Sequence, residues 1–373
     1  MIYFDNNAST AIDERVLDVM LPFLKNYHGN PSSLYRLGRL SRSSIATARE
    51  QIAALVSASS PCQVILTSGG TESNNLALNN LAYYSTNKKL AVSAIEHPSV
   101  LEPAQLLKQQ LDVSLIKVTP QGIIDIEHLI RLAKQGVDSF SMMLANNETG
   151  AIQTIALLNQ QLRQYNPNIS IHTDAVQAIG KLSVNFQQLN CDFMSLSSHK
   201  IYGAKGCGAL IVKSPQKLQA LINGGGQEQG KRAGTENVAA IVGFGKAAEL
   251  AMNELNQRQQ KLKVLTDYLQ QQLKKLPNLT IFAENSPRLM NTVQIGLPTV
   301  DGEMLLMHLD KHNIAISSGS ACASGGGEPS HVLLAMGVSP VLAKSAIRIS
   351  LGQHNTQPEI DTFIHYLTNY LCH

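Results

Sequence analysis

Short apolar runs alternate with helix-length segments between residues 62 and 213. The runs read QVILTS, LAVSAI, VSLIKV, FSMMLA, ISIHTD, FMSLSS and GALIVK. One such run is compatible with a strand or with a buried stretch of helix, but seven of them in this rhythm indicate βαβ units. The pattern therefore predicts an α/β fold with a mostly parallel sheet.

A helical pattern rich in Ala, Leu, Gln and Lys follows, from about residue 236 to residue 275. We predict one long helix here, which joins a large sheet domain to a smaller C-terminal α/β unit. A length of 373 residues is too great for one small domain and supports this division. We place the large domain at residues 13–255, and the small domain at residues 1–12 together with 256–373.

Composition and charge exclude several classes of protein. Apolar residues make up 44% of the chain and charged residues 15%, which is typical of a globular protein. The net charge of +3 and the lack of a Lys/Arg cluster argue against direct nucleic-acid binding. No apolar run approaches the ~20 residues of a membrane span, and the first residues do not read as a secretory signal.

The cysteines are odd in number, scattered, and without CxxC spacing. This usage predicts a reducing, cytoplasmic location, and it argues against a disulfide framework and against a self-contained metal site. The five are Cys62, Cys191, Cys207, Cys322 and Cys372.

A glycine turn follows the first predicted strand. Ligands of open α/β sheets bind beyond the carboxyl ends of the strands, so chemistry is expected there. The segment ILTSGGTESNN runs through Gly69 and Gly70 into a helix predicted to begin at Thr71. Free N–H groups and the helix dipole make such a turn a phosphate cradle, and the Thr71 hydroxyl adds a donor. The turn alone is a weak signal, because Thr also caps helices for structural reasons.

Other strand ends carry further polar residues. They are His97 in IEHPSV, Asn147 in ANNETG, Asp174 and Gln177 in HTDAVQ, and Ser197, Ser198, His199 and Lys200 in LSSHKIYG. Singly, Asp174 could cap a helix, His97 could be a core histidine and Lys200 could be solvated. Together with the phosphate cradle they suit pyridoxal 5′-phosphate, which needs a lysine amine for its Schiff base and an anion beside its ring nitrogen.

Cys322 stands in SSGSACASGGGEPS, a run of serines and glycines without apolar anchors. Glycine leaves the backbone free and serine competes locally for its hydrogen bonds, so the segment is predicted to be a mobile loop. A buried structural cysteine normally has apolar neighbours. The alternatives are an incidental loop thiol or a nucleophile that has to travel.

The chain resembles the class V aminotransferase group of pyridoxal-phosphate enzymes, and specifically the group I cysteine desulfurases. The resemblance covers nearly the whole length. It is carried by FDNNAST, GNPSS, TSGGTESNN, EHPSV, NNETG, TDAVQ, SSHKIYG, KRAGTEN, SSGSAC, EPSHVL and IRISLG, in family order. It implies fold type I of the pyridoxal-phosphate enzymes, conversion of L-cysteine to L-alanine, and transfer of the sulfur to an acceptor.

The resemblance also implies roles for individual residues. The cofactor-binding set is Gly70, Thr71, His97, Asn147, Asp174, Gln177, Ser197, Ser198, His199, Lys200 and Thr235. Within it Lys200 matches the Schiff-base lysine, and His97 matches a ring-stacking histidine that moves protons. Thr235 matches a phosphate contact supplied by the second subunit, which implies a homodimer.

Substrate and sulfur are assigned in the same way. Arg348 matches the arginine that binds the substrate carboxylate, with Asn7 and Asn147 in the same pocket. Cys322 matches the nucleophile that takes the sulfur as a persulfide, and it is also the candidate for a transient iron–sulfur ligand. A mobile loop suits this role, because the persulfide must reach an acceptor outside the pocket.

The sequence departs from the family pattern at several places. Tyr35 stands where histidine is common, Gln229 replaces an arginine, and Ala204 replaces a proline. The loop reads SGGGEPS where bulkier residues are usual, and the chain ends at NYLCH, without the longer tail that some relatives use to dock a scaffold partner. None of these departures touches the cofactor chemistry, but the last leaves the sulfur acceptor open: an iron–sulfur scaffold, a tRNA-thiolation enzyme or a general sulfur pool.

Three rival functions follow from the same fold. A class V aminotransferase needs no mobile thiol, so Cys322 argues against it. A selenocysteine lyase is chemically closer and is poorly separated by sequence. A non-catalytic sulfur-carrier or scaffold subunit would keep the fold without the chemistry, and the presence of Lys200, Asp174 and Cys322 argues against it.

Overall fold

The computed structural model describes residues 1–298, 300–318 and 328–371, and Cys322 lies outside them. The strands are β1 (Ile2–Tyr3), β2 (Val64–Thr67), β3 (Lys89–Ser93), β4 (Asp112–Ile116), β5 (Ser139–Ser141), β6 (Ser170–Asp174), β7 (Phe193–Ser197), β8 (Gly208–Val212), β9 (Thr280–Ile281), β10 (Thr292–Gly296), β11 (Ile314–Ala315), β12 (Ser317–Ser318) and β13 (Ile347–Ser350).

The α-helices are α1 (Glu14–Lys25), α2 (Arg36–Leu55), α3 (Gly70–Tyr84), α4 (Pro98–Leu107), α5 (Ile126–Lys134), α6 (Ile155–Tyr165), α7 (Phe186–Leu189), α8 (Val238–Asn253), α9 (Leu255–Leu273), α10 (Gly302–Lys311), α11 (His331–Ala335), α12 (Pro340–Lys344) and α13 (Gln357–Leu371). Short 3₁₀ turns lie at η1 (Pro61–Gln63), η2 (Ser198–Lys200), η3 (Pro215–Lys217) and η4 (Gln227–Gly230).

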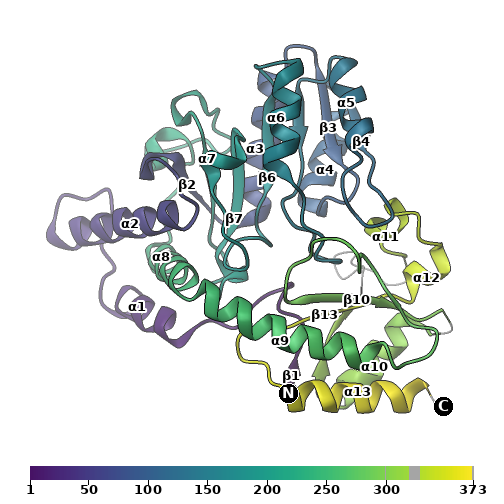
Figure 1. Ribbon diagram of the computed structural model, residues 1–373. Coiled ribbons are helices and arrows are strands. Elements are labelled where there is room, and N and C mark those ends of the chain that lie inside the picture. Colours follow the sequence, from purple (N-terminus) through teal and green to yellow (C-terminus); the bar gives the residue numbers. More distant parts are fainter. Residues whose placement is uncertain (299, 319–327, 372–373) are drawn as a thin grey trace.

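A seven-stranded sheet forms the upper part of the molecule in Figure 1, in the order β2-β8-β7-β6-β5-β3-β4. All its neighbours pair in parallel except β8, which runs antiparallel to β2 and β7. Each of the seven apolar runs contributes one of these strands. The prediction of an α/β fold with a mostly parallel sheet is therefore confirmed.

Both faces of this sheet are buried, which explains the nearly continuous apolar runs. Ile211 contributes to a core with α2, α6 and α8, whereas its neighbours Leu210 and Val212 contribute to a second core with α3 and α4. Alternate side chains of a strand point to opposite faces, so one strand supplies both cores. Because helices cover both faces of the sheet, a ligand site is expected at its carboxyl edge.

A second layer lies below the large sheet in Figure 1. It contains a four-stranded antiparallel sheet, ordered β12-β13-β10-β9, packed against α9, α10 and α13. The N-terminal strand β1 pairs with β11, and Phe4 packs edge-on against Phe363 at 5.9 Å between ring centroids. The first residues of the chain therefore share a core with its last helix. The proposed domain limits at 12/13 and 255/256 stay a prediction.

The prediction of one long helix over residues 236–275 was wrong. Two helices, α8 and α9, meet at Glu254, whose backbone has φ −102° and ψ 3°. The Glu254 carboxylate pairs with Arg15 of α1 and Arg258 of α9. The bend lets α8 pack on α1 and α2 while α9 turns its apolar side to the smaller core. None of the described helices is long and apolar enough to cross a membrane.

Candidate active site

A cavity of about 310 Å³ lies at the carboxyl edge of the large sheet. Most of the predicted site residues line it, although they come from both ends of the chain. They are Asn7, Gly70, Thr71, His97, Asn147, Asp174, Gln177, Ser197, His199, Lys200 and Arg348.

The first turn of α3 forms one end of the cavity. The helix begins at Gly70, one residue before the predicted start. A side chain at Gly70 would place its Cβ 3.0 Å from Val176 Cγ2, so glycine allows the helix to approach the wall. The N–H groups of a first helical turn have no partner within the helix and favour an anion. Beside them, the buried Ser197 hydroxyl has no hydrogen-bond partner among the described residues.

Asp174 ends strand β6 and is nearly buried. One carboxylate oxygen accepts a hydrogen bond from the Val176 N–H at 2.8 Å, and the other accepts one from Asn74 Nδ2, also at 2.8 Å. Asn74 also donates to Ser99 Oγ at 2.8 Å. Asp174 is therefore a fixed anion in the cavity wall.

His97 precedes α4 and is held by its own helix. Its Nδ1 accepts the Ser99 N–H at 3.1 Å and lies 2.8 Å from Ser99 Oγ. Because Nδ1 is an acceptor, the neutral ring carries its proton on Nε2. Burial lowers the pKa of His97, while the Asp174 charge acts in the opposite direction. Burial and the Lys200 charge likewise lower the pKa of His199, to about 4. Both rings are therefore neutral near pH 7.

Lys200 lies in the turn after β7 and reaches the N-terminal segment. Its Nζ donates to the carbonyl oxygens of Asn7 at 2.6 Å and Ala8 at 2.7 Å. The Asn7 carbonyl also accepts a bond from Gln177 Nε2 at 2.9 Å. The lysine amine and the glutamine amide thus meet at one backbone oxygen.

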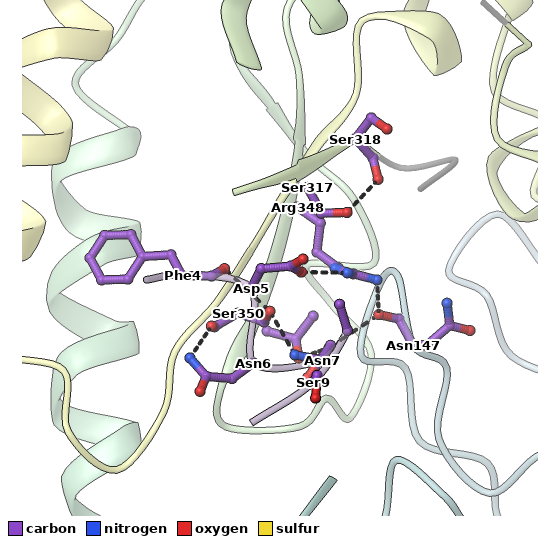
Figure 2. A network of polar contacts seen from close by, with 12 residues as sticks. Phe4, Asp5, Asn6, Asn7, Ser9, Asn147, Ser317, Ser318, Arg348 and Ser350 are labelled. Carbon is purple, nitrogen blue, oxygen red and sulfur yellow. Dashed lines mark hydrogen bonds and ion pairs between the residues drawn. The ribbon is translucent and has the colours of Figure 1, made fainter. Parts of the chain in front are cut away.

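Arg348 enters the cavity from β13. Its side chain is 4% exposed, and Nη2 forms a 2.7 Å ion pair with Asp5 while Nη1 donates to the Asn147 carbonyl at 3.0 Å (Figure 2). Asn7 Nδ2 donates to the same carbonyl at 3.1 Å. These contacts join the N-terminal segment, the loop after β5 and strand β13.

Two of the predicted residues that the structure describes, Ser198 and Thr235, do not line the cavity. The Ser198 side chain is fully buried and does not line the cavity. Thr235 is exposed and lies at a separate hollow of about 210 Å³ with Cys207 and Arg232. Cys322, with the loop prediction made for it, lies outside the described residues.

Sequence reasoning missed three residues that hold the site together. Asn74 holds Asp174, Asp5 holds Arg348, and Lys181 donates to Gln177 Oε1 at 2.7 Å. Asn74 and Asp5 lie in TSGGTESNN and FDNNAST, two of the motifs that carry the family resemblance, and this position is a signal for both residues. Nothing in the local sequence around Lys181 indicates a role at the cavity.

The cavity suits pyridoxal phosphate by its donor set. For a phosphate it offers a helix N-terminus and a buried hydroxyl that has no partner in the described part of the chain. It also offers a fixed carboxylate for a protonated ring nitrogen and an amine for an aldehyde carbon. Gln177 supplies an amide for a ring oxygen. No cluster of three or more His, Cys, Asp or Glu side chains suited to a metal occurs in the described part of the chain.

Comparison with known proteins gives a consistent result. The aminotransferase class-V family matches residues 2–363. A cysteine desulfurase IscS of Dictyoglomus turgidum is 41% identical over 364 residues, which are 96% of this chain and 92% of that protein.

Solved structures agree with the sequence match. A NifS-like protein superposes with a TM-score of 0.93 at 34% identity, covering 100% of this chain and 99% of that one. SspA in complex with cysteine gives a TM-score of 0.83 at 31% identity, covering 95% of this chain and 100% of that one. The chain therefore belongs to the class-V aminotransferase family and, within it, to the pyridoxal-phosphate-dependent cysteine desulfurases.

Proposed function

We propose that the chain releases L-alanine from L-cysteine through the cavity residues named above, and that it passes the sulfur through Cys322 to a protein acceptor. The observation that carries this proposal is the convergence of Lys200, Asp174 and Arg348 on one cavity. An amine, an anion and a guanidinium are the three groups needed to hold the cofactor and an amino-acid carboxylate.

Arg348 is proposed to bind the substrate carboxylate. Its guanidinium is kept in place by Asp5 and the Asn147 carbonyl, while the buried Nε has no hydrogen-bond partner among the described residues. That unpaired donor is a favourable partner for an incoming carboxylate, since a buried unpaired N–H is costly. Asn7 and Asn147 line the cavity beside it.

Lys200 and His97 are proposed to bind the cofactor and move protons. When bound, the cofactor supplies an electron sink that stabilises negative charge at the substrate Cα. The Lys200 amine is the proposed base for the Cα proton, and its carbonyl partners Asn7 and Ala8 hold it at the cavity. His97 is neutral with its proton on Nε2, so it can donate a proton or accept one after donating.

Cys322 is proposed to take the sulfur. Its thiolate attacks the substrate sulfur, the Cβ–S bond breaks, and the electron pair of that bond remains on carbon, where a proton completes alanine. The sulfur atom is left on Cys322 as a persulfide, so the atoms balance. Transfer to an iron–sulfur scaffold or a tRNA-thiolation enzyme is the proposed next step, in a cytoplasmic setting, as the cysteine usage predicts.

A homodimer is proposed to complete the phosphate site. Thr235 is exposed and lies in a separate hollow of its own chain, which supports a role toward a second subunit. Phosphate contacts would then come from α3 of one chain and Thr235 of the other.

The deciding experiment supplies L-cysteine and a thiol reductant to the cofactor-loaded protein and measures products. Equal amounts of alanine and sulfide are expected from the parent chain, and neither from Lys200→Ala. Pyruvate with sulfide, or amino transfer to a keto acid, would contradict the proposal. Selenocysteine, supplied in parallel, tests the lyase alternative: turnover of selenocysteine alone would favour it.

A further inference from the structure

Lys181 is a lysine next to the cavity that the proposed reaction does not use. It follows Gly180 in the turn after β6, and its backbone is held on both sides: its N–H donates to Ala178 O at 3.1 Å and its carbonyl accepts from Gln259 Nε2 at 2.7 Å. The side chain turns back toward the site, where Nζ donates to Gln177 Oε1 at 2.7 Å and lies 3.3 Å from Asn7 Oδ1. The ammonium therefore contacts two residues of the cavity wall.

The ammonium decides how the Gln177 amide is turned. The protonated Nζ of lysine has only donors, so the Gln177 atom that faces the ammonium is the carbonyl oxygen. The amide nitrogen then points the other way, where it donates to the Asn7 carbonyl at 2.9 Å. Asn7 is oriented by the same rule, because its Oδ1 also accepts from Asn291 Nδ2 at 3.0 Å. One N–H of Gln177 remains for an acceptor in the cavity.

The charge of Lys181 also acts on the cavity. Burial is the main cause that lowers the pKa of Lys181, to about 7, and the positive charges of Lys200 and Arg348 lower it further. The interaction is mutual, since Lys181 lowers the pKa of His199. Among the described residues, Lys200, Arg348 and His199 are the charged and titratable groups that interact with Lys181, and all three line the cavity.

We propose that Lys181 is a positioning residue that makes the cavity select a negatively charged ring oxygen on the bound cofactor. It does so by turning the Gln177 amide so that an N–H, and not the carbonyl oxygen, faces the ligand, and by adding positive charge beside Lys200. Without Lys181 the amide can rotate and present its oxygen, which repels an anionic ring oxygen. This inference rests on the proposed function, because it takes the cavity to hold pyridoxal phosphate.

The test titrates the visible absorption of the cofactor-loaded protein with pH. Lys181→Met removes the donor and the charge, so the protonated form of the chromophore is favoured and the midpoint is expected to rise by about one pH unit. Removal of a charged hydrogen bond to Gln177 is expected to weaken cofactor binding to the cofactor-free protein about tenfold. Lys181→Arg keeps donor and charge, and is expected to restore both values toward the parent.

Two further variants separate the effects. Lys181→Gln keeps a donor for Gln177 without a charge, so we expect nearly parental cofactor binding with a raised midpoint. Lys263→Met is the matched control, because Lys263 is 60% exposed on α9 and pairs only with Asp267 among the described side chains. If Lys181→Met does not fold, the comparison of Lys181→Gln with Lys181→Arg still decides. Midpoints equal to the Lys263→Met value in both Lys181→Met and Lys181→Gln would overturn the inference.

Failure of the proposed function gives a different result. In that case the parent chain releases no alanine from cysteine, whatever the spectra of the Lys181 variants. If the parent chain forms alanine but the titration midpoints of the Lys181 variants are unchanged, only the inference about Lys181 is overturned.

Discussion

Arg348 reaches the cavity already paired with a carboxylate from the other end of the chain. Asp5 and Arg348 are 19% and 4% exposed in their side chains and form the centre of the network in Figure 2. Breaking a buried pair by removing one partner is strongly destabilising, because it leaves a buried charge uncompensated. Asp5 therefore orients the guanidinium before any substrate is present.

The first prediction concerns Cys322. Cys322→Ser should leave cofactor binding intact, because the residues that line the cavity already offer partners for the phosphate, the ring nitrogen and the aldehyde carbon. Sulfide release should nevertheless fall by roughly a thousandfold or more, the loss typical when a catalytic nucleophile is removed. Mass spectrometry should find the persulfide on the peptide that carries Cys322 in the parent.

Matched controls come from the other cysteines. Cys62→Ser changes an exposed thiol and should keep parental rates. Burial raises the pKa of the Cys207 thiol to about 12, so it is a poor nucleophile at neutral pH. If Cys322→Ser produces alanine at the parental rate, the assignment of Cys322 as the nucleophile is contradicted.

The second prediction is a pH dependence of stability due to His172. Its ring is fully buried between Ser141 Oγ at 2.8 Å and Ser195 Oγ at 2.9 Å, and burial lowers its pKa to about 3. A histidine of depressed pKa stabilises the fold above its unfolded pKa of about 6.5, and that contribution is lost as the pH falls toward 3. His172 alone should therefore lower the free energy of unfolding by about 1.4 kcal/mol for each pH unit of acidification in this window.

Urea unfolding between pH 7 and pH 4 measures this slope. His172→Gln retains hydrogen-bonding groups but has no titratable ring. The free energy of unfolding should therefore depend less steeply on pH in this variant, by the contribution of one proton. His28 is exposed, so His28→Gln should leave the slope unchanged. An equal slope in His172→Gln and the parent would contradict the prediction.

At the scale of elements, the turn between β6 and α7 carries both Gln177 and Lys181. Gly180 allows this turn, because its φ is +67° and a Cβ would lie 2.6 Å from Ile201 Cγ2. Ile201 directly follows Lys200, so the turn packs against the segment that carries the lysine. The geometry of the turn and the position of Lys200 are therefore linked.

The third prediction separates backbone strain from this close packing. Gly180→Ala combines a positive φ with a steric clash and should lower the free energy of unfolding by about 2–4 kcal/mol. Gly206→Ala is the control, because Gly206 has φ +77° but nothing within 4 Å of its Cβ position, so only a conformational cost of about 1 kcal/mol is expected. Chemical unfolding of both variants provides the measurement. Equal losses would show that packing against Ile201 contributes nothing.

The helix pair α8 and α9 shows where the periodic pattern fails. Apolar residues continue on both sides of Glu254, and residues 246–275 contain no glycine or proline, so the sequence predicts one helix. The bend follows from tertiary contacts, because α8 packs on α1 and α2 while Arg15 and Arg258 hold the Glu254 carboxylate. Such partners are distant in sequence and leave no local signal.

For the whole molecule, the fourth prediction tests the shared site. Mixing Lys200→Ala with Thr235→Val chains should produce heterodimers with one intact site, since both defects fall in the other site. A random mixture should then recover about a quarter of the parental activity per chain. The measurement is alanine formation after joint unfolding and refolding, with each variant alone as control. No recovery, or an active monomer by ultracentrifugation, would contradict the shared site.

The sequence by itself determined the strands of the large sheet and most of the cavity. Parallel strands end at one edge, so residues that follow their strands, such as His97, Asp174 and Lys200, are brought together by the fold class alone. The motifs in family order added Asn7 and Arg348 to the predicted cavity residues. The periodicity of apolar positions gives no reason to place these two residues in the cavity.

Only the tertiary structure decided which partner holds each of these groups. Asp5 pairs with Arg348 across 343 positions, and Asn74 reaches Asp174 across 100. The local sequence gives no signal for Lys181, whose ammonium lies against Gln177 because of tertiary packing. The reason is physical: a hydrogen bond between two side chains is sensitive to changes of a few tenths of an ångström in the distance between donor and acceptor. Those distances are set by how helices and sheets pack, and a pattern along one strand or helix does not contain them.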